Sequence, residues 1–169
     1  MQNLKGKIVS FKYRDRKESF SGFLIDYNDK WTLIMYNPVD YVVDGYLLLK
    51  SDKILKYKIE EEELFKENVL KAKNIIPTED DIFPITDLAE TLKLISDRFG
   101  AFKIEEKDDR VCYIGRFVKM TKKDLYIQEI DSQAKWGEIG KFKLQSIRTI
   151  EFGSDYINSL IVYNKEMEK

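Results

Sequence analysis

The stretch Phe20-Ser-Gly-Phe-Leu-Ile-Asp26 has a counterpart 93 residues later, Tyr113-Ile-Gly-Arg-Phe-Val-Lys119. Each stretch sets bulky apolar residues around a central glycine, Gly22 in the first and Gly115 in the second. Aromatic and β-branched residues favour strands, and a glycine inside a strand often marks a sharp bend or a bulge. Both stretches are therefore predicted to be bent β-strands.

The same offset of 93 residues aligns apolar positions along both halves of the chain without a gap. The aligned pairs include Leu24 with Phe117, Leu33 with Tyr126, Leu49 with Phe142, Ile54 with Ile147 and Ile59 with Phe152. Few of these pairs are identical, but the apolar register is kept. A fixed period of this kind indicates an internal duplication of one strand-rich unit.

Alternating apolar residues and turn signals predict five strands in each copy. The first copy has its strands at 7–13, 20–27, 31–36, 46–50 and 53–59, and the second at 102–106, 111–120, 124–130, 140–144 and 148–152. Helices are predicted at 60–73, where Leu64, Phe65 and Val69 recur near helical spacing, at 86–98 and at 156–163. Gly100 is expected to end the second helix after a Thr or Asp cap at its start.

These elements predict a mainly β protein with accessory helices, an α+β fold. The first small β-barrel is expected at 1–59, and a helix with an acidic linker follows at 60–84. The second barrel, with a preceding helix and a C-terminal helix, is expected at 85–169. At these lengths each copy can bury a modest core of its own.

The arrangement resembles the Sm-like fold, one of the small SH3-like barrels with five strands. In the first copy, Gly6-Lys-Ile-Val-Ser-Phe-Lys-Tyr-Arg-Asp15 looks like the opening strand and charged turn of that family. The stretch Leu49-Lys-Ser-Asp-Lys-Ile54 is similar to the segment that joins its fourth and fifth strands, and Phe142-Lys-Leu-Gln-Ser-Ile147 keeps only the apolar frame. The resemblance implies two such barrels in tandem.

The resemblance also implies a possible RNA site. Sm-like proteins bind RNA with an asparagine and an Arg-Gly pair; here lysines stand at the Asn and Arg positions, namely Lys30 and Lys50 in the first copy and Lys123 and Lys143 in the second. Lysine keeps the charge but lacks the planar, forked donor geometry of arginine. Arg14 and Arg16, in the first charged turn, could add phosphate contacts, or the turn could be an ordinary solvated hairpin.

The chain contains no histidine and a single cysteine, Cys112. Histidine is the commonest general base and metal ligand, and structural zinc sites need several Cys or His ligands. We therefore predict no enzyme activity, no catalytic residues, no cofactor and no metal. Cys112 is expected to be an inert core residue. A lone cysteine, with no bilayer-spanning apolar run and no signal-peptide pattern, leads us to expect a cytoplasmic protein away from membranes.

Two loops contain candidate contacts for a protein partner. Tyr41, Val42 and Val43 lie in an apolar loop of the first copy, and Trp136 is expected in the matching loop of the second. Aromatic residues are enriched at interfaces, although packing against the same barrel is the alternative for each loop. The net charge of −1 is far from that of a dedicated nucleic-acid binder. We predict a non-enzymatic protein-binding module of adaptor, inhibitor or immunity type, with weak RNA binding as the alternative.

Overall fold

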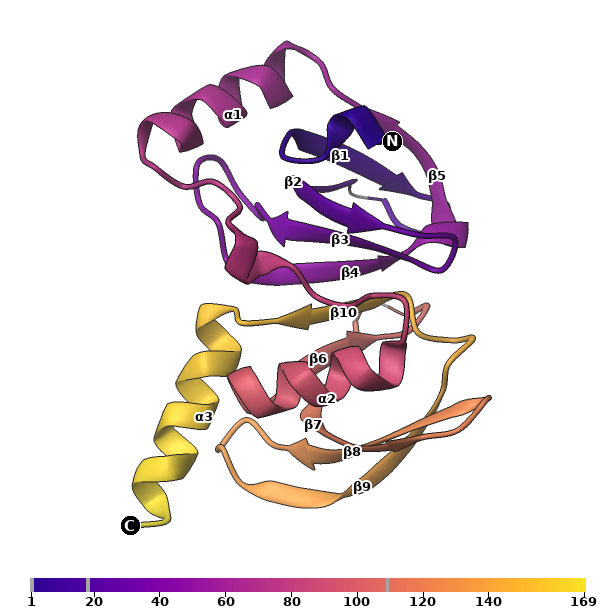
Figure 1. The fold of residues 1–169 in the computed structure, drawn as a ribbon. Helices are drawn as coiled ribbons and strands as arrows, with labels where there is room; N and C mark the ends of the chain where they lie inside the picture. The colour runs from indigo at the N-terminus through magenta and orange to yellow at the C-terminus, as the bar shows by residue number, and fades with distance from the viewer. Residues whose placement is uncertain (1, 18, 109) are drawn as a thin grey trace. The chain divides into compact units, whose positions relative to one another are not determined.

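The computed structural model describes residues 2–17, 19–108 and 110–169. It divides into two compact units, Met1–Ile85 and Thr86–Lys169. Within the described residues the chain is mainly β, with ten strands and three α-helices (Figure 1). The predicted class, mainly β with accessory helices, is confirmed.

The first unit contains one antiparallel set of five strands in the order β5-β1-β2-β3-β4. The strands are β1 (Ile8–Tyr13), β2 (Ser19–Tyr27), β3 (Trp31–Tyr36), β4 (Tyr46–Lys50) and β5 (Ile54–Lys58). Short 3-10 turns lie at Gln2–Leu4, Ser51–Lys53 and Glu79–Asp81, and helix α1 (Glu61–Ala72) follows β5.

The second unit has its five strands in the order β10-β6-β7-β8-β9, again antiparallel. The strands are β6 (Phe102–Glu105), β7 (Cys112–Met120), β8 (Asp124–Ile130), β9 (Trp136–Lys143) and β10 (Thr149–Phe152). Helix α2 (Leu88–Phe99) precedes them and helix α3 (Asp155–Met167) follows. Of the two predicted caps, Thr or Asp, it is Asp87 that caps α2, and Gly100, with φ of 84°, ends the helix as predicted.

The two units pair their strands in the same register. Gly22 lies opposite Tyr36 on β3, and Gly115 lies opposite Glu129 on β8. Each pair is followed by a register shift. The shift lies between Leu24 and Asp26 in β2 and, 93 residues later, between Phe117 and Lys119 in β7. Residues separated by that offset therefore occupy the same place in each unit.

Both central glycines are required by a close approach of two backbones. A Cβ atom on Gly22 would lie 2.2 Å from the carbonyl oxygen of Met35, and one on Gly115 would lie 2.4 Å from that of Gln128. Neither distance is possible between real atoms, so any side chain would push the paired strands apart. This explains why the glycine is shared by two stretches that otherwise differ.

Helix α1 docks on β1 through buried carboxylates. Glu63, 1% exposed, accepts a hydrogen bond from Ser10 Oγ at 2.7 Å, and Glu67, 7% exposed, accepts one from the backbone N–H of Ile8 at 3.0 Å. The pairing of β1 with β5 begins only at Ser10. Glu67 therefore satisfies a backbone donor of β1 beyond the reach of β5.

Helix α3 docks with aliphatic side chains instead. Ile157 and Ile161 are buried in a cluster with Ala101, Ile114, Ile130 and Ala134. Asn164, on the next turn of the same face, donates from Nδ2 to the carbonyl of Ala134 at 2.9 Å. The helix is thereby fixed to the segment that links β8 and β9.

The segment 74–85 packs onto the first unit. The rings of Tyr46 and Phe83 meet edge to face at 5.6 Å, and Asn28 Nδ2 donates to the carbonyl of Ile85 at 2.9 Å. Asp81 is 6% exposed and accepts hydrogen bonds from Tyr46 Oη and from the backbone N–H of Thr78. This part of the predicted acidic linker is accordingly ordered against the strands.

Candidate binding surfaces

The loop between β3 and β4 is held in one conformation by Asn37. This residue is 3% exposed, and its Nδ2 donates to the carbonyls of Val39, Asp40 and Val42 at 3.3, 2.9 and 2.7 Å. Asp40 has φ of 40°, the left-handed region that a tight turn requires. One buried amide therefore organises the whole apolar loop.

The loop exposes large apolar side chains. Val39, Tyr41 and Val42 are 55%, 37% and 50% exposed, whereas Val43 is half-buried. The ring of Tyr41 meets that of Phe65, on α1, at 6.0 Å in an edge-to-face contact, and Phe65 is 59% exposed. We call Val39, Tyr41, Val42 and Phe65 the loop patch.

Phe65 is the member of this patch that the sequence pattern missed. The spacing of Leu64, Phe65 and Val69 predicts an apolar face of α1, but Leu64 and Phe65 are 49% and 59% exposed. The helix buries Glu63 and Glu67 instead, because β1 offers hydrogen-bond donors to their carboxylates. The sequence signal for this buried acidic face is the spacing of Glu63 and Glu67, which are four residues apart and so lie on the same side of the helix.

Trp136 was predicted in a loop, and this placement is wrong because it is the first residue of β9. Its side chain is half-buried, its Nε1 donates to Asn164 Oδ1 at 3.0 Å, and the guanidinium of Arg116 lies 4.3 Å from its ring centroid. Trp136 thus ties β9 to α3. It belongs to the second unit, whereas Tyr41, Val42 and Val43 belong to the first.

The four lysines of the RNA hypothesis form two equivalent pairs. In the first unit the N–H of Ser51, next to Lys50, donates to the carbonyl of Lys30 at 2.9 Å. In the second unit the N–H of Leu144, next to Lys143, donates to that of Lys123, also at 2.9 Å. In each unit, a backbone hydrogen bond thus joins the turn after the bent strand (β2 or β7) to the end of the fourth strand (β4 or β9).

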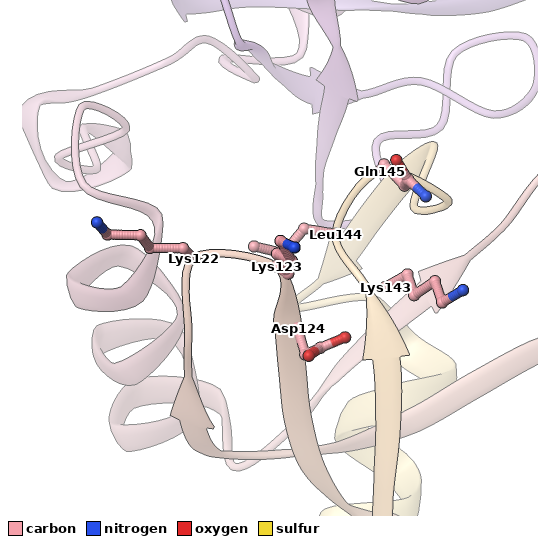
Figure 2. Close-up of a pocket in the computed structure, with 6 residues that line it drawn as sticks. All are labelled: Lys122, Lys123, Asp124, Lys143, Leu144 and Gln145. Carbon is pink, nitrogen blue, oxygen red and sulfur yellow. The ribbon is translucent and has the colours of Figure 1, made fainter.

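The second pair borders a shallow depression of about 410 Å³, shown in Figure 2. It is lined by Lys122, Lys123, Asp124, Lys143, Leu144 and Gln145. Lys122 and Lys143 extend to opposite sides in Figure 2 and do not converge on one point. Asp124 bonds Lys141 at 3.3 Å, and this hydrogen bond and charge raise the pKa of Lys141.

The other basic candidates differ in accessibility. Arg14 is exposed, and its backbone N–H donates to the carbonyl of Lys53 at 3.0 Å. Arg16 is only 8% exposed. Of the two arginines of the first charged turn, only Arg14 presents a side chain that a phosphate could readily reach.

Among residues 2–17, 19–108 and 110–169, no group of three or more His, Cys, Asp or Glu side chains could hold a metal ion. No helix there is long and apolar enough to cross a membrane. Cys112 is exposed, so its predicted place in the core is wrong; it is the first residue of β7, and the buried part of the strand begins at Ile114.

No protein-family model, curated protein or solved structure matches this chain. Function is therefore inferred from geometry and charge. Two surfaces stand out on these grounds: the loop patch of the first unit and the lysine-bordered depression of the second.

Proposed function

We propose that this chain is a non-enzymatic binding module that recognises a protein partner through the loop patch. The observation that carries the proposal is the exposure of Val39, Tyr41 and Val42 on a loop fixed by the buried Asn37. Exposed apolar patches mark interaction sites, and a surface ordered before binding loses little conformational entropy when a partner docks. Lys73 adds to this order, because its Nζ donates to the carbonyl of Tyr41 at 2.8 Å.

We also propose that each unit is a small barrel of the Sm-like or SH3-like kind, and that the pair arose by duplication. The common strand order, the common register and the bulge after each central glycine support this. A cytoplasmic location is part of the same proposal and is supported by the single, exposed cysteine, since oxidising compartments favour paired cysteines.

The decisive variant is Phe65→Asp, which places a charge within the loop patch, next to Tyr41. Tagged wild-type protein would be used to capture partners from the source cell, and direct binding of each purified partner would then be measured. Loss of a buried aromatic contact at an interface weakens binding by roughly thirtyfold or more. Leu94→Asp, at a 42% exposed position of α2, is the matched control.

The control is expected to bind each partner like the wild type. A partner that binds wild type, Phe65→Asp and Leu94→Asp with equal affinity would contradict a role for the loop patch. Circular dichroism of all three proteins would show that the fold is unchanged.

Weak RNA binding is the second candidate, favoured by the presence of Lys123 and Lys143 at one depression. It is tested with fluorescent poly-U at two salt concentrations, using wild type and the variant with Lys30, Lys50, Lys123 and Lys143 all changed to alanine. RNA binding through these lysines must weaken with salt and be lost in the variant. No binding of poly-U at low salt would eliminate this candidate.

A further inference from the structure

A tyrosine stands between two lysines on one face of the second unit. In the register of β7, β8 and β9, Lys119 lies opposite Tyr126, and Tyr126 lies opposite Lys141. The two ammonium groups are 4.7 and 5.9 Å from the centroid of the tyrosine ring. Attraction between a cation and an aromatic ring holds both lysines near fixed positions.

A neighbouring row on the same three strands holds another cation. Arg116 lies opposite Gln128, whose Oε1 accepts hydrogen bonds from Arg116 Nε and Nη2 at 2.9 and 2.6 Å. The guanidinium also lies 4.3 Å from the ring centroid of Trp136. We call Arg116, Lys119, Tyr126 and Lys141 the cationic sheet face.

The fold itself does not require charge at these positions. The residues 93 positions earlier than Arg116, Tyr126 and Lys141 are Phe23, Leu33 and Leu48, and all three are 0% exposed. In the second unit Arg116 and Lys141 are exposed and Tyr126 is half-buried. At these three positions the face is thus apolar and covered in the first unit, and polar and accessible in the second. At the fourth position, Lys119 corresponds to the half-buried Asp26.

We propose that the cationic sheet face binds an acidic, extended segment of a protein. The face has three cations, and Asp124 bonds one of them, Lys141, so its described residues carry an excess of positive charge that attracts negative charge. Ile139, opposite Gln128, is 57% exposed and supplies an apolar contact beside the charges. Cations in fixed positions next to exposed apolar side chains match a peptide in which acidic and apolar residues alternate.

The geometry disfavours single-stranded nucleic acid as the occupant. Base stacking needs an aromatic ring with an open face. Here a lysine lies over Tyr126 and an arginine over Trp136, and Trp136 Nε1 is bonded to Asn164. The rings position cations and are not left open as a stacking platform.

This proposal does not depend on the loop patch, which belongs to the other unit and is apolar. The probe for the test is a fluorescein-labelled peptide in which glutamate alternates with valine. Its binding to the full-length protein would be followed by fluorescence anisotropy at low and moderate salt. A peptide with lysine in place of glutamate is the charge control, and poly-U is the nucleic-acid arm.

We expect the glutamate peptide to bind and its affinity to fall with salt. Removing both lysines in Lys119→Ala/Lys141→Ala should weaken it, by roughly two- to fivefold for each lysine. The matched control is Lys93→Ala/Lys165→Ala, which removes two exposed lysines from helices α2 and α3. That control should bind the glutamate peptide like the wild type.

Variants of Tyr126 test whether binding needs lysines positioned by the ring or only their charge. Tyr126→Ala keeps every cation but removes the ring, and we expect it to weaken peptide binding by roughly two- to fivefold. Tyr126→Phe keeps a ring and should bind nearly as well as the wild type. The proposal is overturned if the glutamate peptide does not bind, if both double-lysine variants weaken it equally, or if poly-U binds more tightly and loses that binding in Tyr126→Ala.

Discussion

The helix that follows the fifth strand is attached by carboxylates in the first unit and by aliphatic side chains in the second. Helix α1 buries Glu63, Glu67 and Leu70, whereas at the positions 93 residues later α3 leaves Tyr156 and Tyr163 exposed. Helix α3 instead buries Ile157, which corresponds to the exposed Leu64 of α1. The two helices therefore bury different faces and dock in different places. Helix α1 packs on β1, whereas α3 packs on the cluster of Ala101, Ile114, Ile130 and Ala134.

This difference teaches that the strand order does not determine how the added helix packs. In the first unit, β1 offers Ser10 Oγ and the N–H of Ile8, and carboxylates are the side chains that best accept from them. In the second unit, Lys103 replaces Ser10 and is held by Glu151 at 2.5 Å and Glu105 at 3.2 Å. These acids neutralise the charge of Lys103 within the sheet, and α3 packs by the hydrophobic effect on the apolar cluster around Ile157.

The largest expected effect comes from two alanine substitutions 93 residues apart. Ile157→Ala removes a fully buried side chain from the α3 cluster and should lower the free energy of unfolding by about 3 kcal/mol. Leu64→Ala, at the equivalent but 49% exposed position, should change it by less than about 0.5 kcal/mol. Urea denaturation measures both, and equal losses would contradict the different helix faces.

A second pair of variants tests what the two units share. Gly22→Ala and Gly115→Ala each place a Cβ within 2.4 Å of a backbone carbonyl oxygen. Each should destabilise its own unit by about 2 to 3 kcal/mol, because neither strand pair can move apart without losing hydrogen bonds. Hydrogen exchange of each unit would locate the loss. Tolerance of alanine at either site would show that the strands are less closely paired there.

Removing Glu67 tests the carboxylate docking of α1. Glu67→Ala leaves the N–H of Ile8 without its acceptor and should lower the free energy of unfolding by about 2 kcal/mol. The control is Glu62→Ala, which removes an exposed acid from the same helix and should have little effect. If both variants were equally stable in thermal unfolding, the bond to Ile8 would not contribute to docking.

The smallest effect is the dependence on pH that Glu63 imposes. Burial favours its neutral form, but bonds from Ser10 and the Glu60 N–H, with the charge of Lys58, outweigh this and lower its pKa. A lowered pKa stabilises the fold above the ordinary value of 4.5, and this contribution disappears as pH falls through the folded-state pKa. In Glu63→Gln, the decrease in the free energy of unfolding below pH 4.5 should be smaller than in the wild type, by roughly 1 kcal/mol or less. Urea titrations at several pH values would measure it, and parallel curves would contradict it.

Local patterns predicted the mainly β class, the helix cap at Asp87 and the end of α2 at Gly100. They failed where a distant partner decided the outcome. Asn164 of α3 holds the half-buried indole of Trp136, and Phe65 is exposed because β1 accepts the acidic face of α1. Neither partner is close in sequence to the residue it places.

The candidate surfaces also divide into one that local sequence predicted and one that depends on distant pairing. Tyr41 and Val42 were identified from an apolar loop, a property of consecutive residues. The row of Lys119, Tyr126 and Lys141 was not, because the bulge in β7 determines which of its residues lies opposite Tyr126. A shift of one residue in a strand moves every later side chain to the other face.

The sequence by itself determined the period of 93 residues, the strands within it and the place of the two glycines. These follow from local rules, since strand formation depends on alternation and a close backbone approach excludes any side chain. Only the tertiary structure decided which helix face is buried and which sheet face carries accessible charge. Those outcomes depend on whether a buried polar group finds a partner from a distant part of the chain, because a buried group without one is costly.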